Sequence, residues 1–371
     1  MTEFNEELQI FPDTEMYSKS MSKLLFLKKF FLDGDFEKKE YELERKMATV
    51  YTGQTKRKCC KICKSNIEKS QLLFMKLNIS YYLCDECGHV NGEYDDPFEY
   101  ASELAKVSAG MAGSNDAIYS DNSTEERLRR VNVIYKPKIQ YLIQILEKYG
   151  EDPAKLSYTE VGAGGGHLIA AMKDMGLINS IGLEASSYLV DTANSSYGSK
   201  VLEHVGDLSL DSLCEHIKGN VAIMIFVLEH ITWPREIFDY FSKNDNTKYV
   251  FFSVPLFNPA VLMDVANDDI SGRTTSFSHT HFFTEKSLSW LCKKTNFEIV
   301  SKWWFGSDSL DLYRTILHKL RKQNQPELLI EICKQMFEAG IDDIQAAYDK
   351  NRLSSEIHLI AKKITLKDSM P

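Results

Sequence analysis

Eight cysteines are present, and four of them lie in two Cys-x-x-Cys pairs that 20 residues separate. Four thiolates at this spacing are typical of one tetrahedral zinc site. Because the protein supplies all four ligands, the sequence predicts a structural Zn2+ rather than a catalytic one. Cys59 and His89 are neighbouring donors, so a ligand set shifted by one residue stays open. The predicted ligands are Cys60, Cys63, Cys84 and Cys87.

A glycine-rich turn forms the second chemical pattern. Gly162, Gly164 and Gly166 alternate with other residues, and Glu184 follows about 20 residues after the first of them. Glycine lacks a Cβ, so the backbone can turn sharply and let a bulky ligand lie against amides at a helix N-terminus. The carboxylate then reaches the end of the next strand, where it can accept hydrogen bonds from ribose hydroxyls. His167 stands where a dinucleotide fingerprint has its last glycine, which weakens a nicotinamide interpretation.

Histidines provide the candidate general bases. His230 follows Glu229 at the end of an apolar run, and His279 and His281 lie in a later loop. A histidine of near-neutral pKa is the usual group to take a proton from an acceptor hydroxyl. His230 is the first candidate because the end of a parallel strand opens on the ligand crevice. For each histidine, a structural hydrogen-bonding role is the alternative.

The hydrophobic pattern predicts the elements that hold these residues. Residues 158–186 have the form strand, glycine turn, helix, strand, acidic residue, and 220–231 is the continuous apolar run of a strand buried on both faces. Residues 201–207, 248–255 and 296–304 are also predicted strands. Together they predict an α/β fold with a Rossmann-like sheet.

The motif Glu160-x-Gly162-x-Gly164-x-Gly166, followed by Glu184, resembles the first two motifs of class I S-adenosylmethionine-dependent methyltransferases. The Leu-Glu-His-Ile-Thr-Trp-Pro segment at 228–234 is similar to a segment that follows the fourth strand in this family. The resemblance implies S-adenosyl-L-methionine as cofactor. An acidic residue after the third strand contacts the adenine amine in the family, which indicates Asp207, with Asp211 as a competitor. The implied cofactor-binding residues are Glu160, Gly162, Gly164, Gly166, Glu184 and Asp207.

A four-cysteine lobe before such a domain resembles the sugar C-methyltransferase family, which acts on nucleotide-linked deoxysugars. The resemblance covers about residues 58–310 and places Glu229 and His230 at the family's proton-abstracting position. Val227 stands where a tyrosine is expected, so carbon, oxygen and nitrogen all stay open as the methylated atom. The expected reaction is in-line methyl transfer to a saccharide, such as a nucleotide sugar or glycan, or to another small polar acceptor.

The 371 residues suffice for one full-sized domain with smaller lobes. After Gly306, helices are predicted at 310–321, 325–339 and 342–363, and they either cover the sheet or bury a homodimer seam. The expected parts are a helical N-terminal arm (1–55), a zinc-ribbon lobe (56–100), a linker (101–130), the methyltransferase domain (131–310) and a helical C-terminal extension (311–371).

Charge and composition narrow the partners. The formal net charge of −9 and the acidic segment 93–99 argue against a nucleic-acid partner, which would need a basic surface. No apolar run reaches the roughly 18 to 20 residues of a membrane helix, and the reduced cysteines without a signal peptide favour the cytoplasm. Two other functions stay open, a non-catalytic zinc scaffold that binds a partner and a methyltransferase for RNA or protein.

Overall fold

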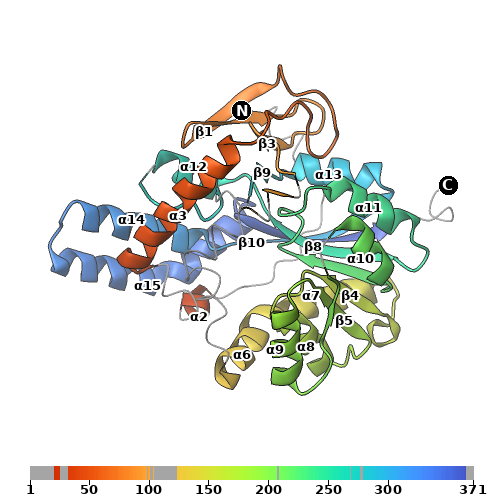
Figure 1. Cartoon of the computed structure of the whole chain (residues 1–371). Coiled ribbons are helices and arrows are strands. Elements are labelled where there is room, and N and C mark those ends of the chain that lie inside the picture. Colours follow the sequence, from red (N-terminus) through yellow and green to blue (C-terminus); the bar gives the residue numbers. More distant parts are fainter. Residues whose placement is uncertain are drawn as a thin grey trace.

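A seven-stranded sheet lies at the centre of the molecule, with the strand order β10-β11-β8-β7-β4-β5-β6 (Figure 1). This computed structural model describes residues 21–25, 32–97, 99–100, 103, 123–206, 209–267, 269–275 and 279–364. The strands of the sheet are β4 (Tyr158–Val161), β5 (Ser180–Glu184), β6 (Leu202–His204), β7 (Val221–Ile225), β8 (Tyr249–Pro255), β10 (Phe297–Phe305) and β11 (Glu356–Lys363).

Five of these strands are parallel neighbours. β4 pairs with β5 on one side and with β7 on the other, and β6 and β8 extend the sheet outward from them. The chain therefore reverses its direction of winding at β4, and ligands of open α/β sheets bind at the carboxyl ends of the strands at such a point. The predicted Rossmann-like α/β sheet is confirmed.

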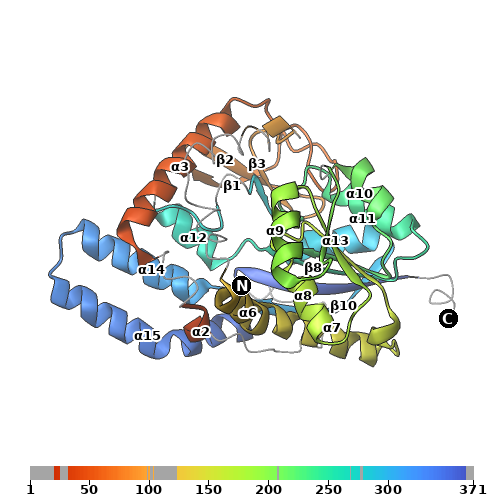
Figure 2. The same cartoon turned by 60° about the horizontal axis from the view of Figure 1, so that its bottom comes forward.

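Helices cover both faces of the sheet, as the buried apolar strands require. Within β8, Tyr249 and Phe251 pack against one helical layer, whereas Val250 and Phe252 pack against the other. Figure 2 shows the first layer in front of the sheet. The first layer contains α7 (Lys136–Lys148), α8 (His167–Asp174) and α9 (Ser187–Tyr197), and the second contains α10 (Leu210–His216), α11 (Pro234–Lys243) and α13 (Glu285–Lys294). α6 (Thr124–Arg130) and a π-helical turn, η2 (Val131–Tyr135), lead into α7, and the 3-10 turn η3 (Pro153–Lys155) follows it.

The C-terminal part differs from the sequence prediction. Instead of helices at 325–339 and 342–363, one helix, α15 (Glu327–Lys350), runs through, and β11 then enters the sheet antiparallel to both β8 and β10. Apolar residues of 356–363 also suit a helix face, but pairing on both sides of the strand outweighs this local pattern. The predicted helical extension is thus correct for α14 (Asp308–Lys322) and α15, which project together in Figure 1, and wrong for β11.

The cysteine lobe shares a sheet with the α/β domain that follows it. β1 (Gln71–Lys76) and β2 (Ile79–Leu83) form a short hairpin, and β3 (Val90–Gly92) continues it. The fourth strand, β9 (His281–Phe282), comes from the α/β domain and pairs antiparallel with β3. The lobe is therefore not an independent unit, and its folding is coupled to the loop that follows β8.

The N-terminal region contributes α2 (Met21–Leu25) and the long helix α3 (Gly34–Thr52), which Asp33 caps through the Asp35 amide. α3 buries two carboxylates, Glu37 and Glu44, against the segment 271–275, which follows α12 (Pro259–Ala266). None of the described helices combines the length and the apolar character that a membrane span requires.

Candidate functional site

The glycine turn joins β4 to α8 at the switch point of the sheet. Gly162, Gly164 and Gly166 all have left-handed backbones, with φ of 66°, 53° and 72°. At the end of β5, the Glu184 carboxylate accepts hydrogen bonds from the amides of Gly164 (2.8 Å) and Ser186 (3.0 Å). The structure therefore brings the predicted glycines and the predicted carboxylate together, and Glu184 also holds the shape of the turn.

Replacing Gly162 by alanine is expected to deform this turn. An added Cβ would lie 2.8 Å from Cγ2 of Val227, and the left-handed backbone costs an L-residue about 1 to 2 kcal/mol. Gly176→Ala is the matched control, because Gly176 is also left-handed (φ 87°) but has open space around it. We expect titration calorimetry to show S-adenosylhomocysteine binding weakened by about tenfold or more in Gly162→Ala alone. Equal affinities of the two variants would contradict a tight fit at Gly162.

Glu160 lies within β4, directly before the turn, and is 4% exposed. Burial raises its pKa well above the usual range, and Glu184 adds to this while Lys138 opposes it. Its Oε2 has no hydrogen-bond partner among the described residues. At the start of α8, burial lowers the pKa of His167 to about 4, and its Nδ1 lies 2.5 Å from the Tyr197 hydroxyl. The remaining predicted cofactor residue, Asp207, lies outside the described residues.

A cavity of about 290 Å³ lies beside the glycine turn. Phe226 lines it, and the next residue, Val227, is the one that faces Gly162. The segment directly after β7 thus contacts the cavity through one residue and the glycine turn through the next. Charged and titratable side chains dominate the remaining wall, and they are Lys138, Glu229, His230, Arg273, His279 and Glu356.

Three of the four predicted catalytic residues meet in this cavity. One ligand-type atom from each of Glu229, His230 and His279 lies within 4.8 Å of the others. Burial raises the pKa of Glu229 to about 8, and its Oε2 has no hydrogen-bond partner among the described residues. Burial, with a smaller effect of His230, lowers the pKa of His279 to about 3, so this imidazole is neutral.

The fourth predicted catalytic residue, His281, does not line the cavity. It lies in β9, fully buried, and its Nδ1 is 2.8 Å from Nε2 of His89 in the cysteine lobe. The geometry therefore gives His281 a place at the junction between lobe and domain. His89 also faces the Ser287 hydroxyl at 3.4 Å, so it is directed toward the domain rather than toward the cysteines.

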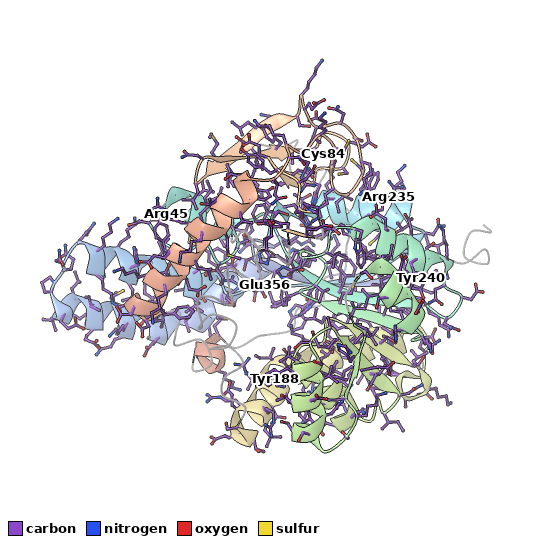
Figure 3. All side chains as sticks on the ribbon, viewed as in Figure 1. Arg45, Cys84, Tyr188, Arg235, Tyr240 and Glu356 are labelled. Atoms are coloured by element: carbon purple, nitrogen blue, oxygen red, sulfur yellow. The ribbon has the colours of Figure 1, made fainter. Side chains whose placement is uncertain are left out.

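Sequence reasoning missed Arg273 and Glu356 as cavity residues. The Arg273 guanidinium donates to Asp311 (2.8 Å) and to Glu356 (2.9 Å), which lies near the centre of the molecule in Figure 3. These pairs join residues 38 and 83 positions apart, and Glu356 belongs to the strand that was predicted as helix. No local pattern indicates such contacts, whereas a correct assignment of β11 would have placed Glu356 at the end of the sheet.

The four predicted metal ligands also converge. The Sγ atoms of Cys60 and Cys87 are 3.6 Å apart, those of Cys63 and Cys84 are 3.4 Å apart, and all four lie within 4.8 Å of one another. A tetrahedral Zn2+ with Zn–S bonds of about 2.3 Å requires S···S distances of about 3.8 Å. The donor set therefore fits Zn2+. The neighbouring Cys59 is exposed and lies outside the cluster.

Comparison with known proteins supports the catalytic domain. Residues 131–302, slightly less than half of the chain, match a family model described as a methyltransferase domain. No curated protein matches the chain. Similar solved structures include magnesium protoporphyrin IX methyltransferase from Synechocystis PCC 6803 with bound S-adenosylhomocysteine (11% identity, 68% of this chain and 90% of that chain, TM-score 0.40).

Two further solved structures are similar at the same level. Plantazolicin methyltransferase has 11% identity over 70% of this chain and 91% of that chain, with a TM-score of 0.41. Coclaurine N-methyltransferase has 12% identity over 61% of this chain and 73% of that chain, with a TM-score of 0.38. Scores this low carry no argument about the acceptor. The family match and the sheet with its glycine turn show that residues 131–302 form an S-adenosylmethionine-dependent methyltransferase domain.

Proposed function

We propose that the enzyme transfers a methyl group to a saccharide, such as a nucleotide sugar or a glycan, or to a similarly polar small acceptor. The observation that carries this proposal is the cavity beside the glycine turn, whose wall offers carboxylates, imidazoles and a guanidinium to hydroxyl groups. A polyhydroxylated acceptor suits such a wall because buried polar groups need hydrogen-bond partners.

The glycine turn and Glu184 are proposed to hold the cofactor. In this proposal the amides at the start of α8 contact the amino acid part of the cofactor and the Glu184 carboxylate contacts its ribose. Asp207, from its position after the third strand, is the proposed partner of the adenine amine. S-adenosyl-L-methionine supplies a methyl group that its sulfonium already activates. The chain's own contribution is then to align the acceptor and to exclude water.

His230 is proposed as the general base, with His279 as the second candidate. His230 lies at the carboxyl end of β7 and lines the cavity with Glu229, so an acceptor hydroxyl there is within its reach. Burial lowers the pKa of His279 to about 3, so its imidazole is neutral but only weakly basic, and for this reason it ranks behind His230. His281 is not proposed as a base, because its ring pairs with His89 outside the cavity.

A structural Zn2+ is proposed for the cysteine lobe. Cys60, Cys63, Cys84 and Cys87 fit its tetrahedral geometry, and the Asn91 amide lies 3.5 Å from Cys60 Sγ as a hydrogen-bond donor to the sulfur. All four positions come from the protein, so the ion holds the lobe and takes no part in methyl transfer.

Glu184→Ala tests the cofactor site. This change removes two hydrogen bonds between the carboxylate and the turn, together with the acceptor for the ribose hydroxyls. We expect the affinity for S-adenosylhomocysteine to fall by about 100-fold, because hydrogen bonds to a charged group contribute about 1.5 to 3 kcal/mol each. Calorimetric titration of both proteins measures this. Glu203→Ala, which removes a half-buried carboxylate on β6 that pairs with Lys200, is the control. If the unaltered protein does not bind S-adenosylhomocysteine, the proposed methyl transfer is refuted. If it does bind, incubation with methyl-labelled cofactor and with nucleotide sugars or glycans tests the acceptor.

A further inference from the structure

The cluster of Glu229, His230 and His279 has the composition of a metal site. One carboxylate and two imidazoles offer atoms within 4.8 Å of one another, and the two rings have centroids 4.8 Å apart. Ligand atoms around an ion with bonds of about 2.1 Å lie about 3 to 3.5 Å apart. A contraction of about 1 to 2 Å, which side-chain rotation can supply, would bring the three atoms onto one ion.

The Glu229 carboxylate provides a second observation. It is 2% exposed and lines the cavity, yet its Oε2 has no hydrogen-bond partner among the described residues. A buried carboxylate oxygen without a partner costs about 1 to 3 kcal/mol or more. A cation in the cavity would satisfy this oxygen and offset the effect of burial on the carboxyl group.

His279 is oriented as metal-binding histidines are. Its Nδ1 lies 3.1 Å from the carbonyl oxygen of Thr274, so Nδ1–H donates to this oxygen and the Nε2 lone pair is available. The Thr274 amide in turn donates to the buried Asp264 carboxylate at 3.1 Å. A backbone carbonyl that is itself fixed therefore sets the tautomer and the direction of the ring.

The cations of the cavity wall are already engaged. Arg273 is paired with Asp311 and Glu356. The ammonium group of Lys138 lies over the rings of Phe226 (5.0 Å) and Phe305 (5.3 Å). Arg273 and Lys138 thus each have a partner, so a metal ion at the cluster would not lie beside an uncompensated positive charge.

We propose that Glu229, His230 and His279 bind one divalent transition-metal ion that holds the acceptor through its oxygen atoms. Two imidazoles and one carboxylate favour ions such as Zn2+, Fe2+, Mn2+ or Co2+ over Mg2+ and Ca2+, and three protein ligands leave positions open on the cavity side. Two neighbouring hydroxyl groups, as on a sugar ring, are the fitting chelator. This assignment rests on the proposed function and refines its acceptor.

The ion would also settle how the acceptor is activated. A hydroxyl bound to a divalent ion loses its proton to solvent more readily, because the ion lowers the pKa of bound water in the same way. The acceptor oxygen then bonds to the methyl carbon while the carbon–sulfur bond breaks, and the electron pair of that bond stays on sulfur. The metal keeps its oxidation state. With the ion bound, His230 acts as a ligand in place of the base role proposed above, and the methylated atom is oxygen.

Cobalt titration of the full-length protein tests this site. Metal-free protein should take up about two Co2+ per chain, one with the thiolate-to-cobalt absorption of the cysteine lobe and one with only the weaker bands of nitrogen and oxygen ligands. Glu229→Gln and His279→Ala should each reduce the uptake to about one, while the thiolate band and S-adenosylhomocysteine binding remain. His204→Ala, an exposed histidine outside the cavity, should keep both ions.

Each outcome separates the two proposals. Uptake of a single Co2+ with the thiolate band by the unaltered protein, or unchanged uptake in both variants, would overturn the cavity site while the cofactor site stands. If the unaltered protein fails to bind S-adenosylhomocysteine, the proposed function falls, and a second Co2+ would then mark a metal site without methyl transfer. Because stoichiometry in the unaltered protein decides first, a variant that fails to fold leaves the test intact.

Discussion

Replacing Cys84 by serine is expected to unfold the cysteine lobe and to abolish methyl transfer, while cofactor binding persists. Cys84 is one of four clustered thiols, and Zn2+ contributes on the order of 10 kcal/mol to folding in isolated zinc peptides. Even a loss of several kcal/mol would lower the melting temperature by about 10 °C or more. Figure 3 labels Cys84 in the lobe, which lies above the strands β4 and β5 labelled in the same view in Figure 1.

The effect should reach the cavity because the lobe holds the loop that carries His279. β3 pairs with β9, and the Gly92 amide donates to the carbonyl of Thr280, the residue directly after His279. The Thr284 hydroxyl also donates to the Gly88 carbonyl at 2.9 Å. Without the lobe, these anchors are lost and the base candidates of the cavity move relative to each other.

Three measurements on the Cys84→Ser protein check this expectation, namely metal content, calorimetric titration with S-adenosylhomocysteine and thermal unfolding. We expect about one metal ion fewer per chain, a lower melting temperature and cofactor affinity within a factor of a few. Cys59→Ser, an exposed neighbour outside the cluster, should change none of them. A Cys84→Ser protein with full metal content and unaltered melting would show that the lobe is not a metal site.

Local patterns in the sequence sufficed for the parts of the fold that short segments determine. The strand, turn, helix and strand of residues 158–186 follow from glycine spacing and apolar runs, and the structure confirms this unit. Thr284 caps α13 and Pro234 begins α11, as their positions indicate. The cysteine pairs and Glu229 with His230 were likewise found from type and spacing, and the structure brings each group together.

What the sequence did not reveal depends on contacts between distant segments. β11 is stabilised as a strand by its backbone pairing with β8 on one side and β10 on the other, whereas its own residues suit a helix equally well. β9 has two residues and is a strand only through its pairing with β3. The pairs of Arg273 with Asp311 and Glu356 join α14 and β11, so neither their burial nor their place in the cavity wall leaves a local signal.

The helix α3 lies in the segment that the sequence predicted only as a helical N-terminal arm. Glu37, 3% exposed, accepts a hydrogen bond from the Ser271 amide at 2.6 Å and from the Arg314 guanidinium at 3.0 Å. Glu44 on the same helix accepts from the Gly272 amide at 3.0 Å. Two buried carboxylates of α3 thus hold the segment that carries the cavity residue Arg273.

Glu37→Ala is therefore expected to lower the free energy of unfolding by about 3 to 5 kcal/mol, because it leaves the buried Arg314 without its nearest partner. Chemical denaturation measures this change, and Glu42→Ala, an exposed carboxylate on the same helix, should stay within about 0.5 kcal/mol of the unaltered protein. The double variant Glu37→Ala/Arg314→Ala should lose less free energy of unfolding than the sum of the two single variants, because removing both partners leaves no buried charge without its counterpart.

Kinetic measurements distinguish a role of Glu37 in positioning the cavity from a role in stability alone. In Glu37→Ala at a temperature where it stays folded, Ser271 loses its acceptor and the Arg273 segment shifts, while the glycine turn keeps all its contacts. We expect a higher KM for the acceptor with unchanged affinity for S-adenosylhomocysteine, and Glu37→Gln should restore part of it by accepting the Ser271 amide again. An equal loss of acceptor and cofactor binding would instead mean that α3 supports the whole domain, and that the cavity has no separate anchor in the N-terminal helix.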